Sequence, residues 1–165
     1  MVEKTIVECP EIKLIGISVR TSYQEEQDVT TAKVLPCLRR YFSENISEKI
    51  VDALDTDMTI FAYTEYDPDH LGAYTYFIGE EVSSFAHVPE GLVTHTIPAQ
   101  TYIQFTPDPG PMMRVAAQAW EAIGQLSEAE LGGKRTYRTD FEVYDDETVD
   151  HTKAVVHLYV GIQPL

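Results

Sequence analysis

Two cysteines in 165 residues are too few for a disulfide framework. Cys9 and Cys37 match no metal-binding or redox spacing, so the sequence indicates a reduced, cytoplasmic protein. No apolar run approaches the ~18 residues that a membrane span needs. The first residues, "MVEKTIVECPEIK", also lack the apolar stretch of a signal peptide. We therefore expect no membrane insertion and no secretion.

Basic residues are scarce as well. The chain has 12 Lys and Arg against 27 Asp and Glu, and its formal net charge is −15. This balance argues against direct binding to nucleic acid, whose phosphates need clustered Lys and Arg, and it favours cationic partners. The alternative, that the protein is simply acidic, stays open.

Several catalytic and metal-binding motifs are missing. The sequence has no glycine-rich phosphate loop and no G-x-S-x-G nucleophile motif. Acidic residues and histidines occur together in "DPDH" (67–70) and "DDETVDH" (145–151), but both stretches are typical of hairpin turns and neither has calcium-loop spacing. Cys37 lies beside apolar helical residues and is expected to be buried rather than nucleophilic. We predict no catalytic residue, no metal and no cofactor.

Apolar residues make up 44% of the chain and aromatic residues 10%, which is typical of a globular protein. Period-two alternation predicts strands, and apolar residues at i, i+3 and i+4 predict helices. In chain order the prediction is a strand at 11–22, a helix at 30–45, strands at 58–67 and 73–82, strand-like sequence at 92–106 with a break at Pro98, a helix at 110–126, and strands at 136–145 and 153–163.

These elements form a weak internal repeat, in which the order strand, helix, strand, strand occurs twice. We predict a single α+β domain over residues 1–165, built from two βαββ units related by a pseudo-two-fold axis. The half-repeats are about 10–87 and 88–163. The helices would cover one face of an antiparallel sheet, and the opposite face would be concave.

One strand carries an unexpected charge. In "TDFEVYDD" (139–146), Glu142 lies between the apolar residues Phe141 and Val143. Either Glu142 faces water, or it lines a cavity and binds a positive group. With the Tyr-Asp pairs of the two halves aligned, Glu142 corresponds to Thr64, so the carboxylate belongs to the second half alone.

Four stretches carry a resemblance to a known family. They are "GAYTYFIGEEV" (72–82), "VPEGLVTHTIPAQTYIQFT" (88–106), "AWEAIGQ" (119–125) and "YRTDFEVYD" (137–145). In this order they resemble the GyrI-like small-molecule-binding domain family, which includes the effector-binding domains of AraC-type and MerR-type multidrug-responsive regulators. The resemblance implies the duplicated βαββ fold. The chain resembles the stand-alone members carried in integron gene cassettes, and from its length we expect no DNA-binding domain.

The resemblance also implies a site for lipophilic organic cations. In such members a glutamate near the middle of the penultimate strand lies among aromatic residues, and this position matches Glu142. An ionised carboxylate in an apolar pocket is costly unless it is compensated, and a delocalised cation compensates it while burying apolar surface. Aromatic rings add a cation–π attraction of about 0.5–2 kcal/mol each.

The predicted aromatic partners come from the last strand, the second helix and the first half. Tyr159 and His157 share a strand face where the family pattern places pocket residues, and Trp120 lies on the helix stripe. Tyr76 corresponds to Tyr159 if the tyrosines of the repeat are aligned, whereas aligned glycines select Phe77. The predicted ligand-binding set is Glu142, Tyr159, Trp120, Tyr76, His157, Phe105 and Tyr63, and ordinary core packing is the alternative for each aromatic residue.

We also expect an orientation for the Glu142 strand. Phe141 and Val143 would pack under the helices, and Glu142 would point into the concave seam between the halves. Asp140 and Tyr144, on the same side as Glu142, would flank it.

Three functions are consistent with this interpretation. The first is a stand-alone binding module for amphipathic organic cations, with a ligand-sensing or transcription-related role. The second is a small-molecule hydrolase, with the pocket carboxylate as a general base on water. The third is an acidic interaction factor, similar to relatives implicated in gyrase inhibition, that engages a transcription regulator or another basic protein partner. The first is preferred, because the sequence offers no nucleophile–base pair.

Overall fold

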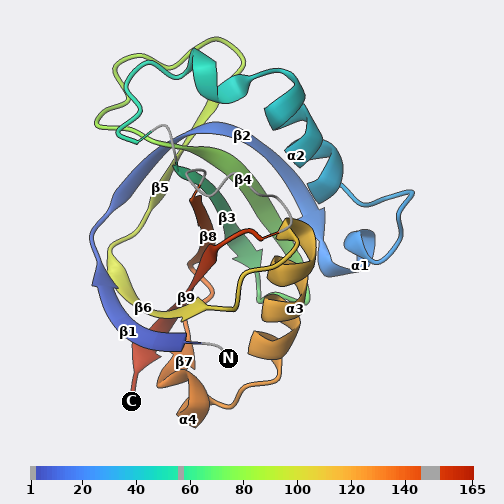
Figure 1. Ribbon diagram of the computed structural model, residues 1–165, viewed down its shortest axis with the longest axis vertical. Coiled ribbons are helices and arrows are strands. Elements are labelled where there is room, and N and C mark those ends of the chain that lie inside the picture. Colours follow the sequence, from blue (N-terminus) through green and yellow to red (C-terminus); the bar gives the residue numbers. More distant parts are fainter. Residues whose placement is uncertain (1–2, 56–57, 146–152) are drawn as a thin grey trace.

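The structure is a computed structural model that describes residues 3–55, 58–145 and 153–165 (Figure 1). Its elements in chain order are β1 (Glu3–Cys9), β2 (Ile12–Ser22), α1 (Tyr23–Glu26), α2 (Val34–Ser43), the 3-10 helix η1 (Ile46–Lys49), β3 (Met58–Asp67), β4 (Ala73–Glu81), β5 (Val93–Ile97), β6 (Gln100–Thr106), α3 (Met112–Gly124), α4 (Glu128–Leu131), β7 (Gly133–Arg135), β8 (Thr139–Asp145) and β9 (Val156–Pro164). The main predicted strands and helices are confirmed, whereas β1, α1, η1, α4 and β7 are not predicted from the sequence. The acidic turn predicted at 145–151 lies, from residue 146 on, outside the described residues.

The strands form one antiparallel sheet in the order β1-β6-β9-β8-β3-β4-β2-β5, and β7 pairs with β9 beside this path. The predicted repeat is visible in this order. The units β2-α2-β3-β4 and β6-α3-β8-β9 contribute the strand triplets β3-β4-β2 and β8-β9-β6, which meet where β3 pairs with β8. The fold is therefore of the α+β class, with two βαββ units joined edge to edge.

Both long helices lie on one face of the sheet. Tyr41 of α2 and Ile123 of α3 belong to the same buried cluster as Phe61 of β3 and Leu158 of β9. Figure 1 shows β1 and the first part of β2 on the side of the molecule away from the two helices, whereas the last part of β2 runs beside α2. None of the helices in the described residues is both long and apolar enough to cross a membrane.

The face without helices is closed by the sheet itself. A second buried cluster joins Leu14 of β2, Phe77 of β4, Tyr102 of β6 and Phe141 of β8. The strands β2 and β6 stand near opposite ends of the strand order, so they share a core only because the sheet curls. The rings of Tyr102 and Phe141 meet edge to face, with their centroids 5.2 Å apart. Side chains therefore fill the concave face that was predicted to hold the ligand site.

Helix α2 begins at Val34 rather than at residue 30, because the residues before it form turns. Its first backbone N–H groups are bound by the carboxylate of Glu26, which accepts from the N–H of Lys33 at 2.8 Å and from that of Val34 at 3.2 Å. Pro36 lies in the first turn, where a missing N–H is tolerated. This attachment fixes the start of α2 over the sheet.

Candidate functional site

Glu142 lies in the middle of β8, and its side chain is only 3% exposed. It stands directly opposite Phe61 of β3 and Leu158 of β9. Residues opposite each other in antiparallel strands point to the same face, so Glu142 faces the helices. The predicted orientation is wrong, because Phe141 and Val143 belong to the cluster on the curled, helix-free face.

Three neutral donors hold the Glu142 carboxylate. The Tyr63 hydroxyl donates to Oε1 at 2.6 Å, and the Trp120 indole N–H donates to the same oxygen at 2.5 Å. The Tyr144 hydroxyl also hydrogen-bonds the carboxylate. Burial raises the pKa of Glu142 above its usual range, and the three hydrogen bonds act in the opposite direction. In the described part of the chain, no Lys, Arg or His forms an ion pair with Glu142.

Aromatic rings surround this carboxylate. The centroid of the Tyr63 ring lies 5.3 Å from that of Trp120 and 5.3 Å from that of Tyr76. The rings of Phe61 and Tyr144 meet edge to face at 5.0 Å. Burial raises the pKa of the Tyr63 and Tyr76 hydroxyls well above the usual value, and the nearby Glu142 adds to the effect, so both phenols stay neutral donors.

These side chains enclose a pocket of about 130 Å³ between the sheet and the two helices, which we call the Glu142 pocket. The helix α2 contributes one wall, α3 the other, and the floor is the β3–β8 seam. The lining residues are Val34, Leu38, Phe61, Tyr63, Tyr76, Ala116, Ala117, Trp120, Glu142 and Tyr144. Phe61 and the α2 residues are missing from the predicted set, because strand register and helix placement decide their position.

The pseudo-two-fold axis passes close to Glu142. Ala62 pairs with Phe77, Phe141 pairs with Tyr159, and Ala62 and Phe141 pair with each other across the seam. With the glycines of "YFIG" and "LYVG" aligned, Phe77 is equivalent to Tyr159, and the axis runs through the Ala62–Phe141 pair.

The axis makes Ala62 equivalent to Phe141. Tyr63 follows Ala62 and Glu142 follows Phe141, so Tyr63 is the residue equivalent to Glu142. The predicted equivalence with Thr64 is wrong, because Thr64 pairs with Thr139 and points to the other face. The phenol that donates to Glu142 thus occupies the same place in the first half that the carboxylate occupies in the second.

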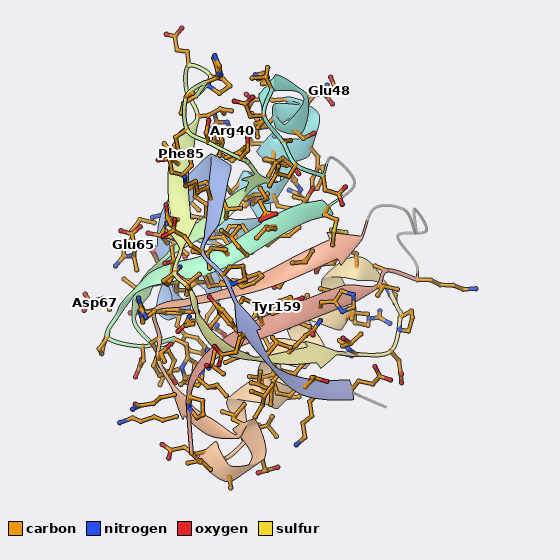
Figure 2. The ribbon with its side chains drawn as sticks, turned by 90° about the vertical axis from the view of Figure 1, so that its left-hand side faces the viewer. Arg40, Glu48, Glu65, Asp67, Phe85 and Tyr159 are labelled. Atoms are coloured by element: carbon orange, nitrogen blue, oxygen red, sulfur yellow. The ribbon has the colours of Figure 1, made fainter. Side chains whose placement is uncertain are left out.

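Tyr159 and His157 lie on the opposite face from Glu142, contrary to the prediction. They pair directly with Phe141 and Val143, and Tyr159 stacks on Phe141 at 4.4 Å. Figure 2 looks at this side of the molecule, where Tyr159 lies near β1. The Tyr159 hydroxyl accepts from the Gln104 amide at 3.1 Å. The prediction failed because residues directly opposite each other in antiparallel strands share a face, and the residue opposite Glu142 on β9 is Leu158.

His157 has a local partner of its own. Its Nδ1 atom lies 2.9 Å from the Thr106 hydroxyl oxygen. Phe105 points to the helix-bearing face, opposite Leu158, but it stands on β6, two strands away from β8. It is 4% exposed in the core and does not line the Glu142 pocket. Of the predicted set, the structure brings together Glu142, Tyr63, Tyr76 and Trp120.

Asp140 shares the face of Glu142 but makes a separate cluster. Its Oδ2 accepts from Arg135 and from the Tyr66 hydroxyl, each at 2.7 Å, and its Oδ1 accepts from the backbone N–H of Gly161 at 2.8 Å. The Asp140 carboxylate is fully buried, its hydrogen bonds go to β3, β7 and β9, and it does not line the Glu142 pocket. Tyr144 does flank Glu142, as expected.

Other reactive chemistry is sparse in the described residues. No group of three or more His, Cys, Asp or Glu there is arranged to hold a metal ion. The Cys37 thiol is buried, and burial raises its pKa to about 11, so it is a protonated, weakly nucleophilic group. What the Glu142 pocket offers is a negative charge, several π faces and a low-dielectric setting.

The duplicated βαββ sheet is the fold of an effector-binding domain family. The chain belongs to the Cass2 family of integron-associated effector binding proteins, whose sequence model matches residues 5–162. This agrees with the GyrI-like resemblance found in the sequence.

Named relatives extend over nearly the whole chain. YobU of Bacillus subtilis (strain 168), a proposed transcriptional regulator, is 27% identical over 152 residues, which is 92% of each protein. The integron cassette protein VCH_CASS2 of Vibrio cholerae has a TM-score of 0.78 at 22% identity, covering 97% of this chain and 95% of that one. The structure of SAV2435 bound to tetraphenylphosphonium has a TM-score of 0.76 at 16% identity, covering 98% and 94%. Relatives of this chain thus include cassette proteins and proteins linked to transcription.

Proposed function

We propose that the chain is a non-catalytic binding module for amphipathic organic cations, which it holds in the Glu142 pocket. One observation carries the proposal. A carboxylate that is 3% exposed is held by three neutral donors and, among the described residues, has no cationic partner. A buried charge without a counter-charge is unfavourable, and a ligand cation supplies the missing one.

The surroundings of Glu142 favour cations with a large apolar surface. Tyr63, Tyr76 and Trp120 present π faces, and Val34 and Leu38 add aliphatic walls. A delocalised or quaternary cation suits this pocket because its charge is weakly hydrated and its body buries against the rings. The tetraphenylphosphonium-bound relative SAV2435, which shares the fold, supports this class of ligand.

The hydrogen-bond capacity of the carboxylate adds a preference. A carboxylate has about four acceptor positions, and Tyr63, Trp120 and Tyr144 already use three of them. Cations that need no hydrogen bond are therefore favoured over primary ammonium groups. The pocket of about 130 Å³ is smaller than a typical drug site of roughly 300–1,000 Å³, so bulky ligands enter only when α2 and α3 separate.

The test is a titration with tetraphenylphosphonium, followed by Trp120 fluorescence and by calorimetry. Trp120 is the only tryptophan and donates to Glu142, so its emission reports on the pocket. Removing one partner of a buried charge pair costs at least ~2 kcal/mol, so Glu142→Gln is expected to weaken binding about 30-fold or more. The matched control is Glu121→Gln, which removes the same charge from the exposed side of α3.

The pH dependence has a definite sign. A proton on Glu142 competes with the cation, so affinity is expected to rise with pH through the raised pKa of Glu142 and then level off. Equal affinities in Glu142→Gln and Glu121→Gln would remove Glu142 from the site. Turnover of a reactive electrophile that is lost in Glu142→Gln would instead support the hydrolase alternative.

We also propose an indirect link to transcription. The relative YobU is a proposed regulator, and a chain with a net charge of −15 is unsuited to contact DNA itself. We therefore propose that the occupied module acts through a protein partner or as a ligand sink.

A further inference from the structure

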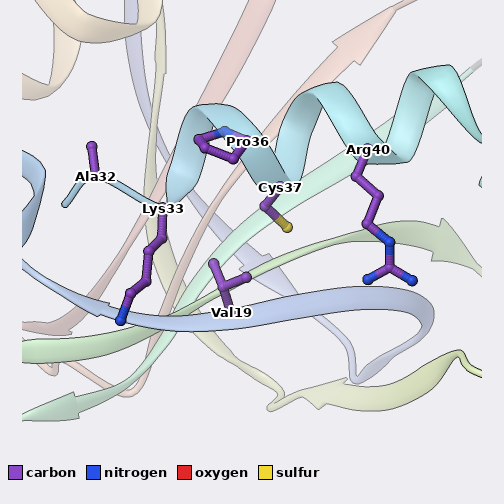
Figure 3. A pocket seen from close by; sticks show the side chains of 6 residues that line it. All are labelled: Val19, Ala32, Lys33, Pro36, Cys37 and Arg40. Carbon is purple, nitrogen blue, oxygen red and sulfur yellow. The ribbon is translucent and has the colours of Figure 1, made fainter. Parts of the chain in front are cut away.

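We propose a second ligand site, on the other side of α2 from the Glu142 pocket, that takes a small amphipathic organic anion, meaning a carboxylate or sulfonate on an apolar body. The site is a pocket of about 250 Å³ between α2 and β2, which we call the Cys37 pocket (Figure 3). Its lining residues are Val19, Ala32, Lys33, Pro36, Cys37 and Arg40. The inference does not depend on the function proposed for Glu142.

The helix spacing creates this pocket. Lys33 at the start of α2 is followed by Pro36, Cys37 and Arg40, a stripe at i, i+3, i+4 and i+7 that lies along one side of the helix. Val34 and Leu38 lie on the neighbouring stripe and line the Glu142 pocket instead. One helix therefore separates two pockets, each lined by its own set of side chains.

The centre of the Cys37 pocket is apolar and uncharged. Cys37 is 4% exposed, and Val19 faces it from β2. Burial raises the pKa of the Cys37 thiol to about 11, so at neutral pH it carries no negative charge that would repel an anion. Pro36 and Ala32 complete a surface suited to a short aliphatic chain or an aromatic ring.

The two ends of the pocket are cationic. Figure 3 shows Lys33 and Arg40 reaching from α2 toward β2 on either side of Cys37. Seven residues of helix place their backbones about 10 Å apart. Arg40 binds Glu44 through Nε at 3.0 Å, and its Nη1 and Nη2 groups make no hydrogen bond to any described residue. Those two nitrogens can bind a carboxylate in the side-by-side geometry that a guanidinium prefers.

The Lys33 ammonium is also available to a ligand. It lies 3.2 Å from Glu25 and donates to the Arg20 carbonyl at 3.2 Å, with about half of its side chain exposed. Exposed pairs of this kind contribute little because water and salt screen them, so a ligand anion can compete with Glu25 and Glu44. The ligand also buries its apolar body against the centre of the pocket, which is a favourable contribution that Glu25 and Glu44 do not make.

The probe is 8-anilinonaphthalene-1-sulfonate, an aromatic anion whose fluorescence rises in apolar sites, with octanoate as the competitor. We expect the folded protein to bind the dye and octanoate to displace it. The double variant Lys33→Gln, Arg40→Gln is expected to weaken dye binding at least tenfold. The matched control, Arg39→Gln with Lys49→Gln, removes two exposed charges that do not line the pocket and is expected to stay within twofold.

A second measurement locates the ligand without altering the pocket. In a Cys9→Ser background, the alkylation of Cys37 by N-ethylmaleimide is followed by mass spectrometry, and octanoate is expected to slow it. Glu142→Gln is expected to leave dye binding unchanged, which separates this site from the cation pocket. The proposal is overturned if the dye does not bind, if both double variants weaken it equally, if tetraphenylphosphonium competes with it directly, or if octanoate leaves Cys37 alkylation unchanged.

Discussion

Glu142 keeps its proton to a higher pH in the folded protein than in the unfolded chain, because burial raises the pKa of its carboxyl above the ordinary 4.5. Between these two pKa values the folded state binds the proton and the unfolded state does not. The free energy of unfolding therefore falls as pH rises through this window, and the loss is complete above the raised value. A group with this behaviour lowers the stability of the free protein at neutral pH.

Replacing Glu142 with Gln is expected to make the free protein more stable at neutral pH while it weakens cation binding. The amide keeps an acceptor for Tyr63 and Trp120 but carries no charge. The free energy of unfolding is expected to rise by about 1.4 kcal/mol for each unit by which burial raises the pKa of Glu142. Urea unfolding followed by circular dichroism between pH 4 and pH 8 measures the difference in free energy of unfolding between the variant and the unmodified protein. This difference should vanish toward pH 4.

The Glu121→Gln variant serves as the reference for this effect, since Glu121 is exposed on α3 and loses the same charge. It should unfold as the unmodified protein does across the whole range. A Glu142→Gln protein that is less stable than the reference at pH 8 would contradict the view that the ionised carboxylate is a net cost.

The neighbouring strands β2 and β4 approach each other closely at a pair of glycines. Gly16 pairs with Gly79, and a Cβ on Gly16 would lie 1.9 Å from the Ile78 carbonyl oxygen. A backbone carbonyl group in a paired strand cannot move aside as the end of a flexible side chain can. Gly16→Ala is therefore expected to lower the free energy of unfolding by about 3 kcal/mol or more.

Gly124, at the end of α3, is the matched control because a Cβ there would meet nothing within 4 Å. Gly124→Ala is expected to raise the free energy of unfolding by about 0.5–1 kcal/mol, since alanine favours helix more than glycine does. Urea unfolding of both variants should give opposite signs. Two equal losses would show that the β2–β4 contact is not what makes Gly16 necessary.

The strands and helices were predictable because their signals are local. The alternation in β2 and the helical spacing in α3 depend only on neighbouring residues. The side on which the helices pack depends on contacts between distant segments. Both β1 and the three-residue β7 pair with partners far away in sequence and have no comparable local signal.

The predicted site residues lie on both faces of the sheet for the same reason. Aligning the two halves on their Tyr-Asp pairs displaces β3 against β8 by one residue from the equivalence that the strand pairing gives, and a one-residue shift exchanges the two faces of a strand. That shift selected Thr64 instead of Tyr63 as the equivalent of Glu142. The glycines are the better anchors, because a Cβ on Gly79 or Gly161 would lie 2.4 Å or 2.6 Å from a neighbouring atom.

At the scale of the whole molecule, the net charge of −15 creates a field that attracts cations over distances longer than any contact. Salt screens such a field, with a Debye length of about 30 Å at 0.01 M and about 8 Å at 0.15 M. The association rate of tetraphenylphosphonium is therefore expected to fall about tenfold between these two concentrations. Stopped-flow measurement of Trp120 fluorescence checks this.

The uncharged triphenylphosphine oxide is the control for this measurement, since it has a similar shape and feels no net attraction. Its association rate should change less than twofold over the same range. If salt lowers the association rates of both compounds equally, it acts on the pocket itself, and the electrostatic field of the protein does not contribute to association.

The axis through Ala62 and Phe141 has one more consequence. A dimer of identical βαββ subunits would place the same side chain at the positions of Tyr63 and Glu142. Two glutamates would repel each other across the axis, and two tyrosines would leave no charge. Fusing both units into one polypeptide lifts this restriction. A pocket with nearly symmetric walls can then bind a ligand in a single orientation, with the charged end of the ligand beside the second βαββ unit.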